Sequence, residues 1–114
     1  MSVRYESRNG IGLVRITTSL SATIAESLPQ QVDAWLQTMP EVKSLVFDLG
    51  EVNFMDSSGL GAMISVFKRM AERGGKTVVA RPQSAVKLML QITRADQILH
   101  IYDTVDDAIR STES

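Results

Sequence analysis

Two adjacent serines, Ser57 and Ser58, stand where a predicted strand gives way to a predicted helix. The apolar run 45–49 that precedes them has the length of a buried strand. The first turn of a helix offers backbone N–H groups without partners and the positive end of the helix dipole, so it stabilises an anion or a side chain that will carry one. Asp56 and both serines also favour the N-cap position, so a well-capped helix without chemistry is an alternative interpretation.

The sequence offers little to other kinds of site. It has one histidine, His100, no cysteine, and no carboxylates grouped at the spacing of metal ligands, so we expect no metal site and a structural role for His100. Asn53 and Asp48 are also expected to be structural. The serine segment lacks the Gly-x-Ser-x-Gly pattern of a hydrolase. Gly59 and Gly61 lack the Lys-Ser/Thr pair of a phosphate-binding loop. We therefore expect no enzyme and no cofactor.

A serine at this turn is better suited to be a substrate than a catalyst. Phosphorylation adds about −1.5 to −2 charges, and the helix N-terminus offsets part of the local cost, by about 0.3 to 1 kcal/mol per charge–dipole contact. The fold should therefore tolerate the modification. A partner docked on the turn would instead meet a dianion beside Asp56, and a hundredfold loss of affinity requires only about 2.7 kcal/mol. The turn is thus predicted to be a binding surface that one hydroxyl controls.

The rest of the chain predicts an α/β fold with a single mixed sheet. Segments 3–8 and 11–17 alternate as strands on either side of Asn9-Gly10, a strong hairpin signal. Segments 45–49, 77–80 and 100–102 predict three further strands. The expected order is β-β-α-β-α-β-α-β-α, with about five strands and about four helices.

Four segments predict the helices. The first allows two interpretations: it either starts at a Thr23-to-Glu26 capping box and bends at Pro29, or starts near Ser27 with Pro29 in its first turn. The second follows Asp56 and the third opens at 82–84. The last is expected from 104 to about 110, with 111–114 as a frayed tail. The apolar residues of the second helix recur at helical spacing and are expected in the core: Leu60, Met63, Ile64, Phe67 and Met70.

Composition narrows the classes of protein further. The 114 residues, 44% of them hydrophobic, suit one domain spanning 1–114. Acidic and basic residues nearly balance at 13 and 12, without a basic cluster, which argues against nucleic-acid binding. No apolar run approaches the roughly 18 residues of a membrane span, and the N-terminus lacks a signal-peptide pattern. Together with the absence of cysteine, this predicts a cytoplasmic protein.

The segment around the serines resembles a known family signature. Its matching parts are Phe47-Asp48-Leu49, Val52 and the string Phe54-Met55-Asp56-Ser57-Ser58-Gly59-Leu60-Gly61. They are similar to the STAS domain, the sulphate-transporter and anti-sigma-factor-antagonist family, and most of all to the small free-standing anti-anti-sigma factors of bacterial stress and sporulation pathways. The resemblance covers nearly the full chain and implies the STAS fold, whose element order is the one predicted above.

The resemblance also implies a function. The phosphoacceptor would be Ser58, with its neighbour Ser57 as the alternative. The kinase would itself be the partner, an anti-sigma factor with an ATP-binding fold of the histidine-kinase type; the unmodified protein would sequester it and free the sigma factor, and a PP2C-type phosphatase would reset the serine. The protein itself would be a monomer or weak dimer. The expected partner-binding residues are Asp56, Ser57, Ser58, Gly59, Leu60 and Ser21.

One position departs from the family pattern. Many members carry an acidic residue in a Gly-x-Leu-Asp string before the first helix, where this chain has Thr18-Ser19-Leu20-Ser21. The missing charge at Ser21 leaves the acceptor turn less acidic and points to a different lineage of partner. Two other functions stay open: a scaffolding STAS module whose serine is never modified, and a module that holds a nucleotide phosphate or small anion at the helix N-terminus.

Overall fold

The chain begins with the predicted hairpin. In the computed structural model, which describes residues 2–113, β1 (Val3–Arg8) and β2 (Ile11–Ile16) pair antiparallel. Asn9 and Gly10 join them with positive φ angles of 51° and 82°, the geometry that an Asn-Gly turn favours. β2 ends at Ile16, one residue before the predicted end.

Three parallel strands complete the sheet. β3 (Ser44–Asp48) pairs with β2, β4 (Thr77–Ala80) with β3, and β5 (Ile101–Tyr102) with β4. The strand order is therefore β1-β2-β3-β4-β5, a single mixed sheet of five strands. The predicted α/β class and mixed sheet are confirmed.

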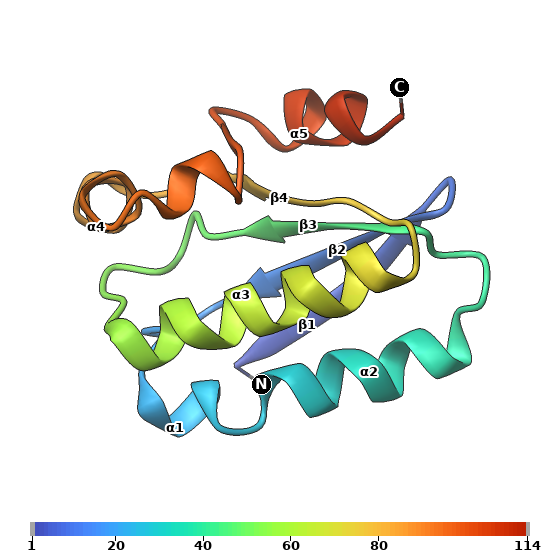
Figure 1. The fold of residues 1–114 in the computed structure, drawn as a ribbon, viewed down its shortest axis with the longest axis horizontal. Helices are drawn as coiled ribbons and strands as arrows, with labels where there is room; N and C mark the ends of the chain where they lie inside the picture. The colour runs from blue at the N-terminus through green and yellow to red at the C-terminus, as the bar shows by residue number, and fades with distance from the viewer. Residues whose placement is uncertain (1, 114) are drawn as a thin grey trace.

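The helices lie on both sides of this sheet, as Figure 1 shows. In that view α3 is drawn across β1 and β2, α1 and α2 lie below them, and α5 lies above β3 and β4. Among the described residues, no helix is long and apolar enough to cross a membrane. The helical bounds are α1 (Ala22–Ala25), α2 (Leu28–Thr38), α3 (Ser57–Glu72), α4 (Ser84–Ile92), the 3₁₀ helix η1 (Ala95–Gln97) and α5 (Val105–Thr112).

β3 is the centre of the core, because all five of its residues are buried. Phe47 packs in the main cluster with the α3 residues Met63 and Met70, while Val46 faces the smaller cluster with Ala108 of α5. Phe67 is partly buried against the main cluster. The predicted core face of α3 is confirmed, and a buried β3 explains why the run 45–49 is apolar on both faces.

The first predicted helix is two helices, and only the second of its two interpretations is confirmed. α2 begins after Ser27 with Pro29 in its first turn, where the missing N–H of proline has no intrahelical partner to lose. The Thr23-to-Glu26 capping box is wrong. Thr23 lies inside the separate four-residue α1, whose N-cap is Ser21, and no side chain caps that helix.

α5 also differs from its prediction at its C-terminal end. Its predicted start is confirmed, because the Thr104 hydroxyl oxygen accepts a hydrogen bond from the Asp107 N–H at 3.0 Å. The helix then extends to Thr112, so the predicted frayed tail is wrong for Ser111 and Thr112. Their hydroxyls donate to backbone carbonyls one turn earlier, each at 2.7 Å, which supports this last turn. Residue 114 lies outside the described residues.

Candidate functional site

The serine turn forms the first turn of α3, as the sequence predicts. Asp56 is the N-cap, in extended conformation, and its Oδ1 accepts a hydrogen bond from the Gly59 N–H at 2.9 Å. Ser57 and Ser58 are the first two helical residues, and both are exposed. Neither hydroxyl forms a hydrogen bond to another described residue, so both are available to an enzyme or a partner from solution.

The segment that follows β2 packs against the serine turn and is hydrogen-bonded to it. Leu20 forms an isolated parallel bridge with Met55. Its N–H donates to the Phe54 carbonyl at 2.9 Å, and its own carbonyl accepts from the Asp56 N–H at 3.3 Å. The contact is so close that a Cβ at Gly59 would lie 2.1 Å from the Leu20 carbonyl oxygen. Gly59 is therefore required by this packing, and Leu20 has a structural role that the sequence did not predict.

The six residues expected to bind a partner fall into two groups. Asp56, Ser57 and Ser58 present polar atoms to solvent, with Asp56 partly buried by its capping role. Gly59 and Leu60 are buried, so they shape the turn from inside. Ser21 follows Leu20 directly and is partly exposed, so the structure does bring its segment beside the turn.

Phe54 is an exposed apolar side chain beside this turn, to which the sequence analysis gave no role beyond its place in the family signature. It is 54% exposed, although it lies two residues before the N-cap in a protein whose other phenylalanines are buried or partly buried. Because Phe54 lies three residues before the exposed Ser57 in the same segment, it is a candidate contact residue of this surface. Its signal in the sequence was a phenylalanine placed in a loop between a strand and a cap.

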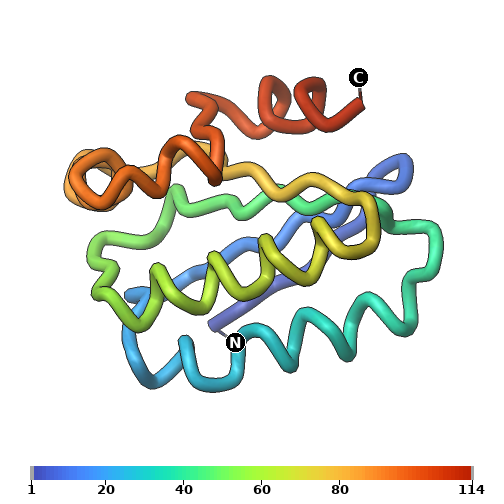
Figure 2. Tube along the Cα trace, in the orientation of Figure 1, coloured from blue at the N-terminus to red at the C-terminus, as the bar shows by residue number. Residues whose placement is uncertain are grey.

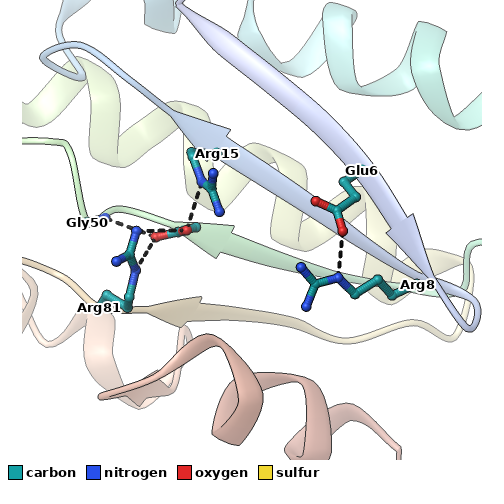
Figure 3. A network of polar contacts seen from close by, with 6 residues as sticks. Glu6, Arg8, Arg15, Gly50 and Arg81 are labelled. Atoms are coloured by element: carbon teal, nitrogen blue, oxygen red, sulfur yellow. Dashed lines mark hydrogen bonds and ion pairs between the residues drawn. The ribbon is translucent and has the colours of Figure 1, made fainter.

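A second polar cluster lies at the same end of the sheet, around Asp48. The Asp48 side chain is 1% exposed. Arg15 reaches it from β2, and Arg81 reaches it from the position directly after β4 (Figure 3). Arg15 Nε lies 3.0 Å from Oδ2, while Arg81 donates from Nε at 2.9 Å and from Nη2 at 3.1 Å. The Gly50 N–H donates to Oδ1 at 3.0 Å. The cluster ties β2, β3 and β4 together at the point where the chain leaves for the serine turn.

The Asp48 carboxylate stays charged because these donors outweigh its burial. Desolvation by burial raises the pKa, but the hydrogen bonds from Arg81, Gly50 and Arg15 together lower it below its usual value. The Arg81 pKa is raised in turn by the hydrogen bond to Asp48. Because each of these charges has a partner of opposite sign, the cluster stabilises the fold, which is the role expected for Asp48.

The sequence also singled out Asn53 and His100, and neither lies in the first turn of α3. Asn53 is exposed and accepts a hydrogen bond from the Ser19 hydroxyl at 3.1 Å, a further tie between the two loops. His100 is exposed just before β5. Within residues 2–113, no group of three or more metal-ligating side chains comes together.

Comparison with models of protein families identifies the family of this chain. The model of the STAS domain matches residues 2–108, nearly the whole chain. The chain belongs to the STAS domain family. The matched residues include both the buried strand β3 and the exposed serine turn, which one loop joins in the trace of Figure 2.

Anti-sigma factor antagonists match this chain from end to end. The anti-sigma F factor antagonist of Paenibacillus polymyxa is 26% identical over 113 residues, covering 99% of this chain and 96% of the relative. A crystal structure of an anti-sigma factor antagonist from Mycobacterium paratuberculosis superposes with a TM-score of 0.84 at 23% identity, covering 98% and 93%.

The anti-sigma factor antagonist SpoIIAA is similar in an unphosphorylated and in a phosphorylated form. Its unphosphorylated form gives a TM-score of 0.81 at 18% identity, covering 97% of this chain and 96% of that one. The phosphorylated form of SpoIIAA from Bacillus gives 0.71 at 17% identity, covering 96% and 97%. At these identities the solved structures establish the shared STAS fold.

Proposed function

We propose that this STAS protein is an anti-sigma factor antagonist controlled by phosphorylation of Ser58. The observation that carries the proposal is the exposure of the Ser58 hydroxyl at the first turn of α3, with no hydrogen bond to another described residue. The end-to-end similarity to the Paenibacillus anti-sigma F factor antagonist supports it, as does the similarity to a relative solved in a phosphorylated form. In this role the protein binds and is modified, and catalyses nothing itself.

Phosphorylation of Ser58 changes partner binding and not the fold, because the contacts that stabilise the turn do not involve the serine hydroxyl. Leu20, Phe54 and Asp56 are tied by backbone hydrogen bonds, and the Asp56 side chain caps the Gly59 N–H. None of these contacts uses a serine hydroxyl, so a phosphate on Ser58 breaks none of them. The free N–H groups and the dipole of α3 offset part of the added charge. A partner surface that covers the turn must instead desolvate a dianion next to the Asp56 carboxylate.

The proposed partner is an anti-sigma factor that is also the serine kinase, with an ATPase fold of the histidine-kinase type. Unphosphorylated protein sequesters it and releases the sigma factor, or an equivalent target. Phosphorylation ends that complex, and a PP2C-type phosphatase restores it. Because Ser21 stands where many relatives carry an acidic residue, we propose that the cognate kinase does not depend on a charge there.

The test is phosphorylation by a co-encoded kinase of this class with ATP, followed by mass spectrometry of the peptide that contains both serines. We expect one phosphate, lost in Ser58→Ala and retained in Ser57→Ala. Loss in Ser57→Ala alone would move the acceptor to Ser57. If the protein binds the kinase and receives no phosphate, and Ser58→Asp binds equally well, the scaffolding function is favoured instead.

A further inference from the structure

β1 forms one edge of the sheet. It pairs with β2, and no other strand within residues 2–113 pairs with it. Its register with β2 is continuous from Val3 to Arg8, so the strand has no bulge, and it contains no proline. Edge strands are commonly shortened, bulged or charged, because their free backbone groups can pair with another chain. β1 has only the charges, on Arg4, Glu6 and Arg8.

The outward backbone groups of β1 belong to every second residue. The Thr17 N–H donates to the Ser2 carbonyl at 2.9 Å, so these two residues form a hydrogen-bonded pair just before the strand. Hydrogen-bonded and non-hydrogen-bonded pairs alternate along an antiparallel ladder, so the even-numbered residues of β1 bond to β2. The odd-numbered residues direct their N–H and C=O groups to the outer edge: Val3, Tyr5 and Ser7. We call this row of groups the β1 edge.

A groove lies between β1 and the helices α1 and α2. Its volume is about 280 Å³. Val3 and Tyr5 line it from the strand, Ile24 from α1 and Gln31 from α2, and none of its described lining residues is charged. Val3 and Tyr5 also pack against the main core cluster, so the groove lies on the helix-covered face of β1. It therefore offers space for an uncharged side chain beside the β1 edge.

Arg4 lies on the other face of β1 without an acidic partner. It is exposed, and none of the ion pairs found among the described residues includes it. Its cross-strand neighbour on β2 is Arg15, a like charge that pairs with Asp48. Glu6, on the same face, pairs with Arg8 instead (Figure 3). Because like charges directly opposite are unfavourable, an acidic side chain on the outer side of Arg4 would be attracted there.

We propose that the β1 edge binds an extended segment of a partner protein, with the pattern apolar–acidic–apolar, as an added strand antiparallel to β1. Its backbone pairs with the outward groups of Val3, Tyr5 and Ser7, and its carboxylate pairs with Arg4. Side chains alternate along a strand, so the apolar residues on either side of the carboxylate face the groove. The serine turn contributes no residue to this site, so the proposal does not depend on the proposed function.

The test is titration of the ¹⁵N-labelled protein with the acetylated and amidated peptide Thr-Val-Thr-Val-Glu-Val-Thr. We expect saturable amide shifts along β1 and slower hydrogen exchange at the outward N–H groups of Tyr5 and Ser7. The exchange of the Glu6 N–H, which already bonds to β2, should change little. This alternation distinguishes strand addition from a carboxylate that only contacts Arg4.

Exchanging the charges tests the role of Arg4. Arg4→Glu should bind the glutamate peptide about threefold to tenfold more weakly than the parent protein does. It should instead prefer the same peptide with lysine in place of glutamate. Lys68→Glu is the matched control, because it makes the same change of charge at an exposed position of α3. It should bind the glutamate peptide like the parent protein.

Ser7→Pro tests the backbone groups. Proline is tolerated on an edge strand where the N–H faces outward, so the variant should keep a cooperative unfolding transition and bind the peptide about tenfold more weakly. If it does not fold, the charge exchange at Arg4 decides. Absence of saturable shifts, protection without alternation, or equal binding of both peptides by Arg4→Glu would each overturn the proposal. If unlabelled protein produces the same shifts and the mass in solution doubles, the β1 edge binds a second copy of this chain instead.

Discussion

The serine turn and the Asp48 cluster lie at the same end of one sheet, only eight residues apart in sequence. They differ in the burial and the hydrogen bonding of their polar groups. Asp48 is 1% exposed and receives hydrogen bonds from two arginines and a backbone N–H. Ser57 and Ser58 are exposed and receive none from the described residues. Buried polar groups that are fully hydrogen-bonded stabilise one structure, whereas exposed polar groups without partners form a surface that another molecule can bind.

The largest effect should come from removing the buried charge. Asp48→Ala leaves Arg15, Arg81 and the Gly50 N–H without their acceptor, and we expect a loss of about 3 kcal/mol in the free energy of unfolding. The expected cost is at the low end for buried ion pairs, because both arginines are partly exposed and can be solvated. Urea denaturation measures it.

The matched control is Asp33→Ala, which breaks the ion pair with Arg69. Both of those side chains are more than 40% exposed, so the loss should stay below about 1 kcal/mol. Equal losses for the two variants would mean that burial does not distinguish the Asp48 cluster from a surface pair.

Ser58→Asp should differ from Asp48→Ala in what it changes. It should weaken binding of the partner and leave the stability of the fold nearly unchanged. We expect affinity for the kinase partner to fall about tenfold to a hundredfold, which is about 1.4 to 2.7 kcal/mol. The free energy of unfolding should change by less than about 0.5 kcal/mol, because acidic residues are tolerated in the first turn of a helix. Calorimetric titration and urea denaturation measure the two quantities.

Ser84→Asp provides the control for a charge at a helix start, because Ser84 is the exposed first residue of α4. It should bind the partner like the parent protein. A comparable loss of affinity in Ser84→Asp would show that net charge, rather than position on the serine turn, governs binding.

The two glycines of the turn separate its inner and outer faces. Gly59→Ala places a Cβ against the Leu20 carbonyl, and we expect a loss of about 1 to 3 kcal/mol in stability. Gly61→Ala meets no atom within 4 Å, so the better helix former should raise stability by up to about 1 kcal/mol. Thermal denaturation of both variants measures this. Destabilisation by Gly61→Ala would show that the outer face is also packed.

The sequence predicted the serine turn well because its signals are local. A strand-length apolar run, a capping residue and a helical stripe together located Asp56 and α3, and the Asn9-Gly10 pair located the hairpin. Leu20 and Arg81 could not be found in this way. Each acts across more than thirty residues, Leu20 on Met55 and Arg81 on Asp48, and such pairings depend on which strands lie side by side. Chain order alone does not specify those neighbours.

The start of α2, which the sequence left open between two interpretations, and the end of α5, which it missed, have a related cause. Thr23 and Glu26 have the spacing of a capping box, but Pro29 fits the first turn of a helix so well that the regular helix starts at Leu28. The polar residues after Arg110 predict fraying, yet Ser111 and Thr112 satisfy their own hydroxyls one turn back and continue α5. In both cases two local preferences compete, and the outcome depends on the packing of the finished fold.

The smallest expected effect is the pH dependence that Asp48 confers, and its sign follows from the cluster. The folded-state pKa of Asp48 is lowered below its ordinary value, so the folded state binds this proton less readily than the unfolded state does. Its contribution to stability is therefore complete above the unfolded-state pKa and is lost as the pH falls through the lower folded pKa. Burial opposes the hydrogen bonds, which keeps the effect below that of deleting the side chain. Urea denaturation at a series of pH values between neutral and acid should show Asp48→Asn losing less stability than the parent protein on acidification. Parallel curves would mean that the carboxylate titrates alike in both states, and that the contrast with the serine turn concerns packing rather than charge.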